Sequence, residues 1–174
     1  MKLKVVEANN LSMSKKERER KIKYEEYGSL QHLTNEDREL LECAFEERDH
    51  AYAPYSGFRV GACIILENGQ KVVGSNQENA SFPAGLCAER VALFTAMGSN
   101  PGIGVKSIAV AAKNLNDNLE SPVFPCGFCA QVLVDLEERQ KSPIRIILGV
   151  DRGPVIILAS SKSILPFAFS IRDL

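Results

Sequence analysis

The sequence lacks several features that mark particular classes of protein. It has no run of about eighteen apolar residues, which a membrane-spanning helix requires. No apolar stretch follows the basic residues at its start, so a secretory signal is not expected. It has no excess of one charge either, because 21 Lys and Arg residues stand against 22 Asp and Glu residues, and a general nucleic-acid binder is usually basic. These absences predict a cytoplasmic protein without a membrane or nucleic-acid partner.

The composition that remains is typical of a globular protein. Hydrophobic residues make up 45% of the 174 residues and charged residues 25%, which excludes disordered and collagen-like classes. Residues 15–26 differ, because they carry ten charges of mixed sign with little apolar periodicity. They predict a solvated helix or a frayed arm. We therefore expect a charged N-terminal extension over residues 1–33 and a single domain over residues 34–174.

Regular structural signals begin at Thr34. Its hydroxyl predicts a helix N-cap, with the acidic Asp37 three residues later and an apolar face along the following turns. Pro54 is expected to end this helix. Two further helices are expected over residues 87–98 and 125–140, where apolar positions recur at helical spacing.

The strongest turn signal is Asn68-Gly69, which predicts an antiparallel hairpin between strands at residues 60–66 and 71–76. Short apolar runs predict three more strands, at residues 105–112, 144–150 and 155–159. Helices interleaved with strands cover both faces of a sheet. The expected fold class is α/β, a three-layer α-β-α sandwich with a mixed sheet of about five strands.

Three of the five cysteines lie where helices are expected to begin. Cys87 precedes one helix, and Cys126 and Cys129 form a C-x-x-C motif at the start of the next. That motif alone is typical of either a redox pair or half of a zinc site. Three thiolates leave one coordination position open, as a catalytic zinc requires, and Glu89 follows Cys87 by two residues. Helix N-termini favour thiolates, and Arg90 offsets part of their charge. A structural zinc or three buried thiols is the alternative.

The other metal-ligand residue types are expected to have structural roles. Cys43 falls on the apolar face of the first helix and Cys63 on a strand, so both are predicted to be small buried hydrophobes, with no disulfide. His32 and His50 lack the spacing to the cysteines that a metal site requires.

Five segments match, in order, the motifs of one enzyme family. They are APYSGFRVGA at residues 53–62, NQENA at 76–80, AGLCAER at 84–90, PCGFCAQVL at 125–133 and LPFAFS at 165–170. On these motifs the chain resembles the small, homotetrameric, zinc-dependent cytidine deaminase family. The resemblance extends over roughly residues 34–174 and agrees with the Cys-Ala-Glu and Pro-Cys-x-x-Cys signature of zinc deaminases.

This resemblance implies a hydrolase of pyrimidine salvage that converts cytidine and 2′-deoxycytidine to uridine and 2′-deoxyuridine plus ammonia. One zinc ion per subunit is implied, held by Cys87, Cys126 and Cys129, where it activates the attacking water. Glu89 is implied as the proton shuttle, and Arg90 as a charge beside the thiolates.

Substrate-binding roles follow from the same resemblance. Asn76 and Glu78 are implied to bind the ribose hydroxyls, Phe58 to pack on the base, and the backbone at Ala88 and Cys126 to contact the edges of the base. The residues implied to come from a neighbouring subunit are Ala80, Phe82 and Phe169. A homo-oligomer is therefore expected, with a tetramer favoured.

Three positions depart from the family pattern: Phe82 replaces a Tyr, Ala130 an Arg and Phe167 a Gly. They leave the preferred nucleoside and the subunit contacts open. The alternative enzyme acts on a related aminopyrimidine nucleoside such as blasticidin S. A non-catalytic zinc-binding interaction protein is a third hypothesis, which Glu89 argues against, and action on polynucleotides is disfavoured by the charge balance.

Overall fold

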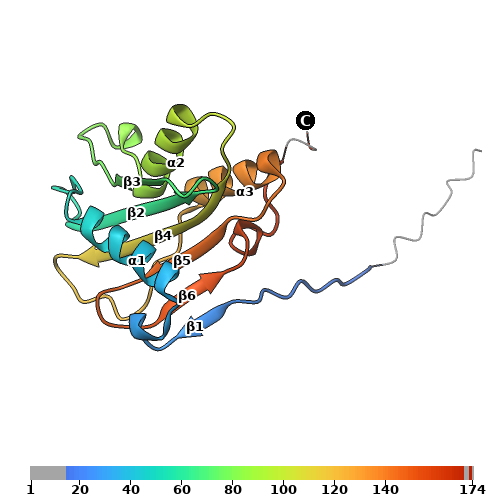
Figure 1. Ribbon diagram of the computed structural model, residues 1–174, viewed down its shortest axis with the longest axis horizontal. Coiled ribbons are helices and arrows are strands. Elements are labelled where there is room, and N and C mark those ends of the chain that lie inside the picture. Colours follow the sequence, from blue (N-terminus) through green and yellow to red (C-terminus); the bar gives the residue numbers. More distant parts are fainter. Residues whose placement is uncertain (1–14, 171–172, 174) are drawn as a thin grey trace, which may run out of the picture.

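A mixed sheet is the middle layer of the computed structural model, which describes residues 15–170 and 173 (Figure 1). Its six strands run in the order β1-β6-β5-β4-β2-β3. Their bounds are β1 (Glu25–Tyr27), β2 (Phe58–Leu66), β3 (Lys71–Ser75), β4 (Val105–Asn114), β5 (Arg145–Gly149) and β6 (Val155–Leu158). Neighbouring strands are antiparallel, except β4 and β5, which are parallel.

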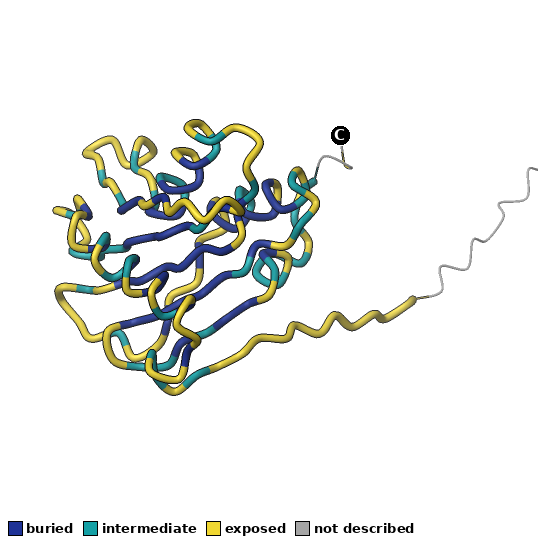
Figure 2. Tube along the Cα trace, in the orientation of Figure 1, coloured by how far each residue is buried: buried dark blue, intermediate teal, exposed yellow. Residues whose placement is uncertain are grey.

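Three helices cover the two faces of this sheet. The helix α1 (Asn35–Arg48) packs on one face, and α2 (Ala88–Ser99) and α3 (Gly127–Gln140) pack on the other. Each face has its own buried apolar cluster, and the strands between them are the most buried part of the chain (Figure 2). The three-layer α/β prediction is therefore confirmed. No helix of the described residues has the length and apolarity to cross a membrane.

The local signals at the start of the domain are confirmed. The Asp37 backbone N–H donates to the Thr34 hydroxyl at 3.2 Å, which caps α1. Gly69 has a φ of 84° in the β2–β3 turn, a left-handed conformation that favours glycine. The helix α1 ends at Arg48, earlier than the proline that was expected to stop it.

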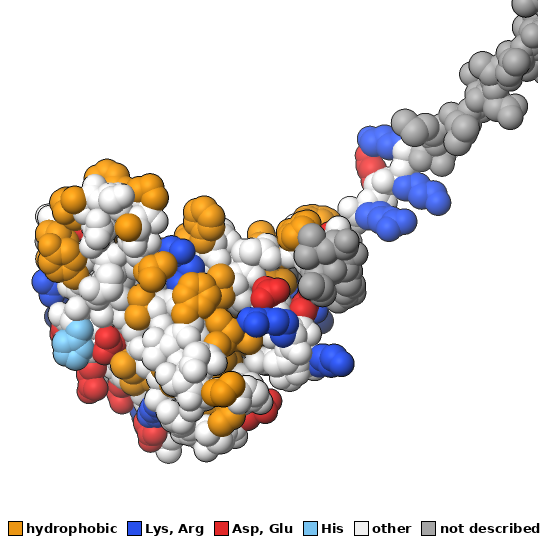
Figure 3. All heavy atoms as spheres, turned by 90° about the horizontal axis from the view of Figure 1, so that it is seen from above, with side chains coloured by type: hydrophobic (Ala, Val, Ile, Leu, Met, Phe, Trp, Pro, Cys, Tyr) orange, Lys and Arg blue, Asp and Glu red, His pale blue; other side chains and the backbone are white. Residues whose placement is uncertain are grey.

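The charged segment at the start of the described chain is an exposed arm and contains no helix up to residue 24 (Figure 2). Figure 3 shows Lys and Arg side chains on the outer part of this arm. Arg20 contacts the body, because its guanidinium donates to the Pro166 carbonyl and lies 4.8 Å from the Phe167 ring centroid. The arm then enters β1, which pairs antiparallel with β6. The prediction of a solvated helix or frayed arm over residues 15–26 was wrong for Glu25 and Glu26, which belong to strand β1. Pairing with β6 orders these residues although their sequence lacks the alternation of a strand.

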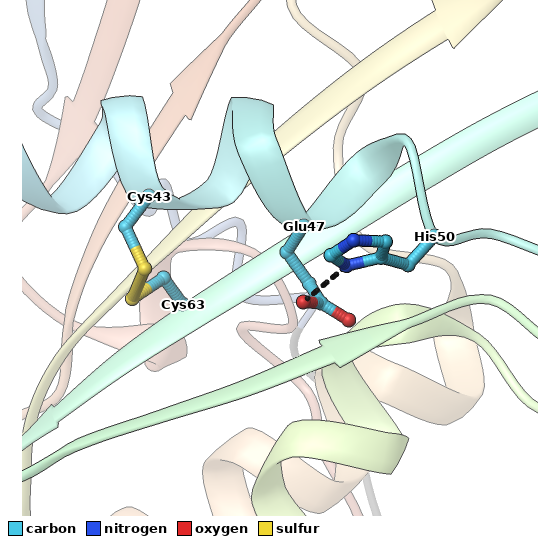
Figure 4. The surroundings of a disulfide bond; sticks show 4 residues. All are labelled: Cys43, Glu47, His50 and Cys63. Atoms are coloured by element: carbon cyan, nitrogen blue, oxygen red, sulfur yellow. Dashed lines mark hydrogen bonds and ion pairs between the residues drawn. A yellow bond between two sulfur atoms is a disulfide. The ribbon is translucent and has the colours of Figure 1, made fainter.

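A disulfide joins Cys43 of α1 to Cys63 of β2, with a Cα–Cα distance of 5.9 Å (Figure 4). The prediction that these cysteines stay unpaired was wrong. Their packing was predicted correctly, because Cys63 is fully buried and Cys43 packs against the same cluster. The helix α1 lies on β2, and this packing brings the two Cα atoms within disulfide range.

Candidate metal centre

Two helix starts bring three thiols together on the α2 and α3 side of the sheet. Cys87 is the N-cap of α2, Cys126 is the N-cap of α3, and Cys129 follows in the first turn of α3. The Sγ atoms of Cys126 and Cys129 are 3.6 Å apart, and those of Cys87 and Cys126 are 3.9 Å apart. All three sulfur atoms lie within 4.8 Å of one another.

These spacings fit a zinc ion. Zinc–sulfur bonds of about 2.3 Å at tetrahedral angles place sulfur atoms about 3.8 Å apart. Thiolates are also the soft ligands that zinc accepts readily. Three sulfur ligands would leave a fourth coordination position for a water, and Cys87 and Cys126 also border a pocket. The cluster therefore has the donor set of a catalytic zinc site.

The charges around the cluster favour thiolate formation at Cys87. Its hydrogen bond with Cys129 and the nearby Arg90 guanidinium lower the pKa of the Cys87 thiol to about 5, against the opposing effect of burial. The Arg90 guanidinium donates to Cys87 Sγ at 3.8 Å and lies 5.7 Å from the Phe128 ring centroid. The pKa of Cys129 is raised, because it is hydrogen-bonded to Cys87 and buried. Arg90 thus sits where a cation balances the sulfur ligands.

Glu89 brings a carboxyl group to the same place. It lies in the first turn of α2, borders the pocket and is only 4% exposed. Burial raises the pKa of Glu89, and the charge of Cys87 acts in the same direction. A carboxyl group in such surroundings takes up and releases a proton more readily near neutral pH than an exposed one does.

A pocket of about 500 Å³ opens above the thiols and Glu89. Four of the residues expected to bind substrate line it, namely Phe58, Asn76, Glu78 and Phe82. Ala88 is fully buried between Cys87 and Glu89. The structure therefore gathers one group of the sequence-predicted residues around a single cavity.

Ala88 does not line the cavity itself, and two further predicted residues also lie outside this lining. Ala80 is exposed on the loop after β3. Phe169 is 59% exposed, and its carbonyl accepts a hydrogen bond from the Gln131 side chain of α3 at 2.7 Å. Within one chain, neither residue reaches the cavity, and their predicted contribution to a neighbouring subunit remains a prediction.

Sequence reasoning missed several lining residues, among them Tyr55, Ser56, Val123 and Phe124. Tyr55 and Ser56 belong to the APYSGFRVGA segment and lie three and two residues before Phe58. Their position in this motif could have indicated that they line the same pocket. Val123 and Phe124 lie in the irregular segment before α3, where no periodic pattern indicated a role.

Comparison with known proteins agrees with this geometry. The family model described as "Cytidine and deoxycytidylate deaminase zinc-binding region" matches residues 34–142, which include all three thiols and Glu89. The cytidine deaminase of Halalkalibacterium halodurans is 38% identical over 139 residues, which are 79% of this chain and 98% of that one. The cytidine deaminase of Sporosarcina psychrophila is 37% identical over 127 residues, 73% of this chain and 86% of that one.

Solved structures show the same likeness. The cytidine deaminase of Burkholderia pseudomallei superposes with a TM-score of 0.67 at 37% identity, over 79% of this chain and 100% of that chain. The cytidine deaminase of Mycobacterium tuberculosis superposes with a TM-score of 0.57 at 32% identity, over 75% and 94%. The chain belongs to the cytidine and deoxycytidylate deaminase family, and its three-cysteine cluster lies in the zinc-binding region of that family.

Proposed function

We propose that this protein hydrolyses cytidine and 2′-deoxycytidine to uridine and 2′-deoxyuridine, with release of ammonia. The observation that carries this proposal is the three-thiol cluster beside the buried carboxyl group of Glu89, at one end of a pocket of about 500 Å³. A metal site alone has no use for such an acid. Hydrolytic removal of an amine needs both an activated water and a group that moves protons.

The chain's own residues divide this chemistry between them. Cys87, Cys126 and Cys129 would hold the zinc, which supplies Lewis acidity that lowers the pKa of a coordinated water to about 7. The Glu89 carboxylate accepts a proton from the attacking water and delivers it to N3 of the pyrimidine ring. It then assists protonation of the departing amine. Arg90 balances the sulfur charge from beside Cys87.

The pocket favours a nucleoside over a nucleotide. Among the described residues that line it there is no Lys, Arg or His, while the Glu78 carboxylate is part of the lining. Recognition of a phosphate normally relies on cationic groups, and the two helix N-termini that border the pocket already carry the thiol cluster. A phosphate beside Glu78 would be repelled, whereas a sugar hydroxyl can donate to that carboxylate. The apolar side chains of Phe58 and Phe124 suit the faces of a base.

A substrate panel tests this proposal. The zinc-loaded protein is incubated with cytidine, deoxycytidine, CMP and blasticidin S, and ammonia release is followed. We expect release from both cytidine nucleosides, little from CMP, and none after removal of zinc with a chelator. Absence of release from every nucleoside would refute the deaminase proposal. A preference for CMP would refute the nucleoside assignment.

We propose further that the protein is a homo-oligomer, with a tetramer favoured. Several aromatic side chains are exposed in a single chain, with exposed fractions of 76% for Phe82, 76% for Phe128 and 85% for Phe167. Hydrophobic side chains also gather on the upper face of the molecule (Figure 3). Large exposed apolar patches are typical of interaction surfaces, and contact with another subunit would cover these side chains.

A further inference from the structure

The side chain of Glu78 is held by the turn that leads into β2. One carboxylate oxygen accepts from the backbone N–H groups of Tyr55 at 2.9 Å and Ser56 at 3.3 Å. The other accepts from the Ser56 hydroxyl at 2.5 Å. These hydrogen bonds, with that of the Ser56 hydroxyl the strongest, lower the pKa of Glu78, so the group stays an ionised acceptor. About four lone-pair positions are available on a carboxylate, so these bonds leave room for a further donor.

The Ser56 hydroxyl also makes a second hydrogen bond, with the backbone two residues further along the chain. It accepts a hydrogen bond from the Phe58 backbone N–H at 2.9 Å while it donates to Glu78. The Phe58 carbonyl in turn accepts from the Asn76 amide at 2.9 Å, and the oxygen of that amide accepts from the Val60 N–H at 2.7 Å. The backbone on both sides of Phe58 is thereby fixed by polar side chains that border the pocket.

The turn itself leaves little freedom for this arrangement. Gly57 has a φ of 66°, and a Cβ atom there would lie 2.8 Å from Nδ2 of Asn116. That same Asn116 amide donates to the Ser56 carbonyl at 3.3 Å, and no hydrogen bond joins it to Glu78 among the described residues. Asn116 therefore supports the backbone of the turn without touching Glu78, and it does not line the pocket.

We propose that Ser56 is a positioning residue for the nucleoside: its hydroxyl couples the Glu78 carboxylate to the Phe58 backbone, so that both face the same ligand. The inference rests on the proposed function. The Ser56 hydroxyl connects the two groups, because it donates to the Glu78 carboxylate and accepts from the Phe58 N–H. Without it, the carboxylate loses its hydroxyl donor and the Phe58 N–H loses its acceptor. Both groups would still be present, but no longer held relative to each other.

Steady-state kinetics on the zinc-loaded protein with cytidine test this role. In Ser56→Ala we expect KM to rise about tenfold, since loss of a hydrogen bond to a charged group corresponds to roughly that factor. We expect kcat to change by less than about twofold, because the hydroxyl does not act on the reacting atoms. Ser56→Thr, which keeps a hydroxyl, should restore most of the affinity. Asn116→Ala is the matched control for general loosening of the turn and should leave KM close to wild type.

A double-mutant cycle separates coupling from a local effect. In the background of Glu78→Ala, which removes the acceptor of the Ser56 hydroxyl, the substitution Ser56→Ala should raise KM much less than it does in the wild type. An unchanged KM in Ser56→Ala would overturn the proposal. So would equal effects of Ser56→Ala and Asn116→Ala, or strictly additive effects in the cycle.

A second measurement does not depend on turnover. Amide hydrogen exchange, followed by NMR, should be faster at Phe58 in Ser56→Ala than in the wild type or in Asn116→Ala, because its N–H has lost its acceptor. Unchanged exchange at Phe58 would refute the positioning role. A wild-type protein that releases no ammonia from cytidine would instead refute the proposed function, and the exchange result would still decide the role of Ser56.

Discussion

At the scale of single residues, Glu89 combines two properties that are rarely found together. Its side chain is almost completely buried, yet it borders the pocket and lies two residues from a thiol of the metal cluster. Burying an ionisable group is costly unless it is compensated. A carboxyl group kept in this position is therefore better explained by proton transfer than by stability.

We predict that Glu89→Gln retains zinc and loses nearly all turnover. The amide has almost the same shape, so the thiol cluster should remain intact, but it cannot accept and return a proton. General acid–base catalysis contributes about 10²–10⁴ in rate, so a loss of at least this size is expected. Zinc content by atomic emission and kcat for cytidine measure the two effects separately.

Glu42→Gln is the matched control for this variant. Glu42 is an exposed acid on α1, which packs on the opposite face of the sheet, and its replacement should leave both readouts unchanged. Turnover near the wild-type level in Glu89→Gln would show that another group moves the proton.

At the scale of elements, Glu137 fastens α3 to the segments around it. Although it is only 6% exposed, its carboxylate accepts from the Ile144 N–H before β5, from the Ser161 N–H and hydroxyl, and from the Ser160 hydroxyl. Burial opposes ionisation, but these hydrogen bonds outweigh it and lower the pKa of Glu137 below its ordinary value. One carboxylate thus joins α3, whose first turn carries Cys129, to the chain before β5 and after β6.

We predict that Glu137→Gln lowers the free energy of unfolding by about 1.5–3 kcal/mol at neutral pH, the range for hydrogen bonds to a charged group. Because the folded pKa is the lower one, the stabilisation is complete above the unfolded pKa of about 4.3 and is lost as pH falls through the folded value. Urea unfolding at several pH values should therefore show the variant and wild type converging in acid.

Asp135→Asn, which removes an exposed pair with Arg139, is the control and should cost only about 0.3–0.5 kcal/mol. A difference that persists unchanged in acid would contradict this role.

The disulfide between α1 and β2 makes a separate contribution. It closes a loop with a sequence separation of 20 residues, for which the chain-entropy model gives about 3 kcal/mol. We predict that a reductant lowers the urea midpoint of the wild type. It should have no effect on the midpoint of Cys43→Ser, which already lacks the bond. A wild type that is insensitive to complete reduction would contradict the estimate.

The elements that could be predicted are those whose signals are local. The Thr34 cap and the Asn68-Gly69 turn each depend on groups within three or four residues, and both occur as expected. The helix starts at Cys87 and Cys126 are equally local, but these two segments lie 39 residues apart in the chain, and their meeting in a metal cluster was anticipated only from the zinc deaminase motifs.

The features that could not be predicted depend on packing between distant segments. The pairing of β1 with β6 and the bond between Cys43 and Cys63 arise only once α1 and the sheet are assembled. The hydrogen bond between Ser56 and Glu78 joins residues 22 positions apart, and no periodic pattern in the sequence predicts such a contact. The division of the chain at Thr34 remains a prediction.

At the scale of the whole molecule, several aromatic rings are exposed on the surface of the single chain, among them Phe82, Phe128 and Phe167. We predict a solution mass four times that of one 174-residue chain by light scattering coupled to gel filtration. Phe167→Asp, which places a charge on the most exposed of these rings, should shift the assembly toward smaller species, since buried aromatic anchors at interfaces are worth about 2 kcal/mol or more. Ile22→Asp on the arm is the control. A monomer at all concentrations would refute the oligomer.

The sheet also divides the cysteines into two chemically independent sets. Cys43 and Cys63 are joined on the α1 side, and the three thiols of the metal cluster lie on the α2 and α3 side. A thiol-reactive chromophore therefore reports metal occupancy, because a chelator leaves the Cys87 and Cys126 thiols free to react, whereas Cys129 is buried and the other two cysteines do not react until a reductant is added. One thiol assay can therefore distinguish loss of metal from loss of the cross-link without any engineered label.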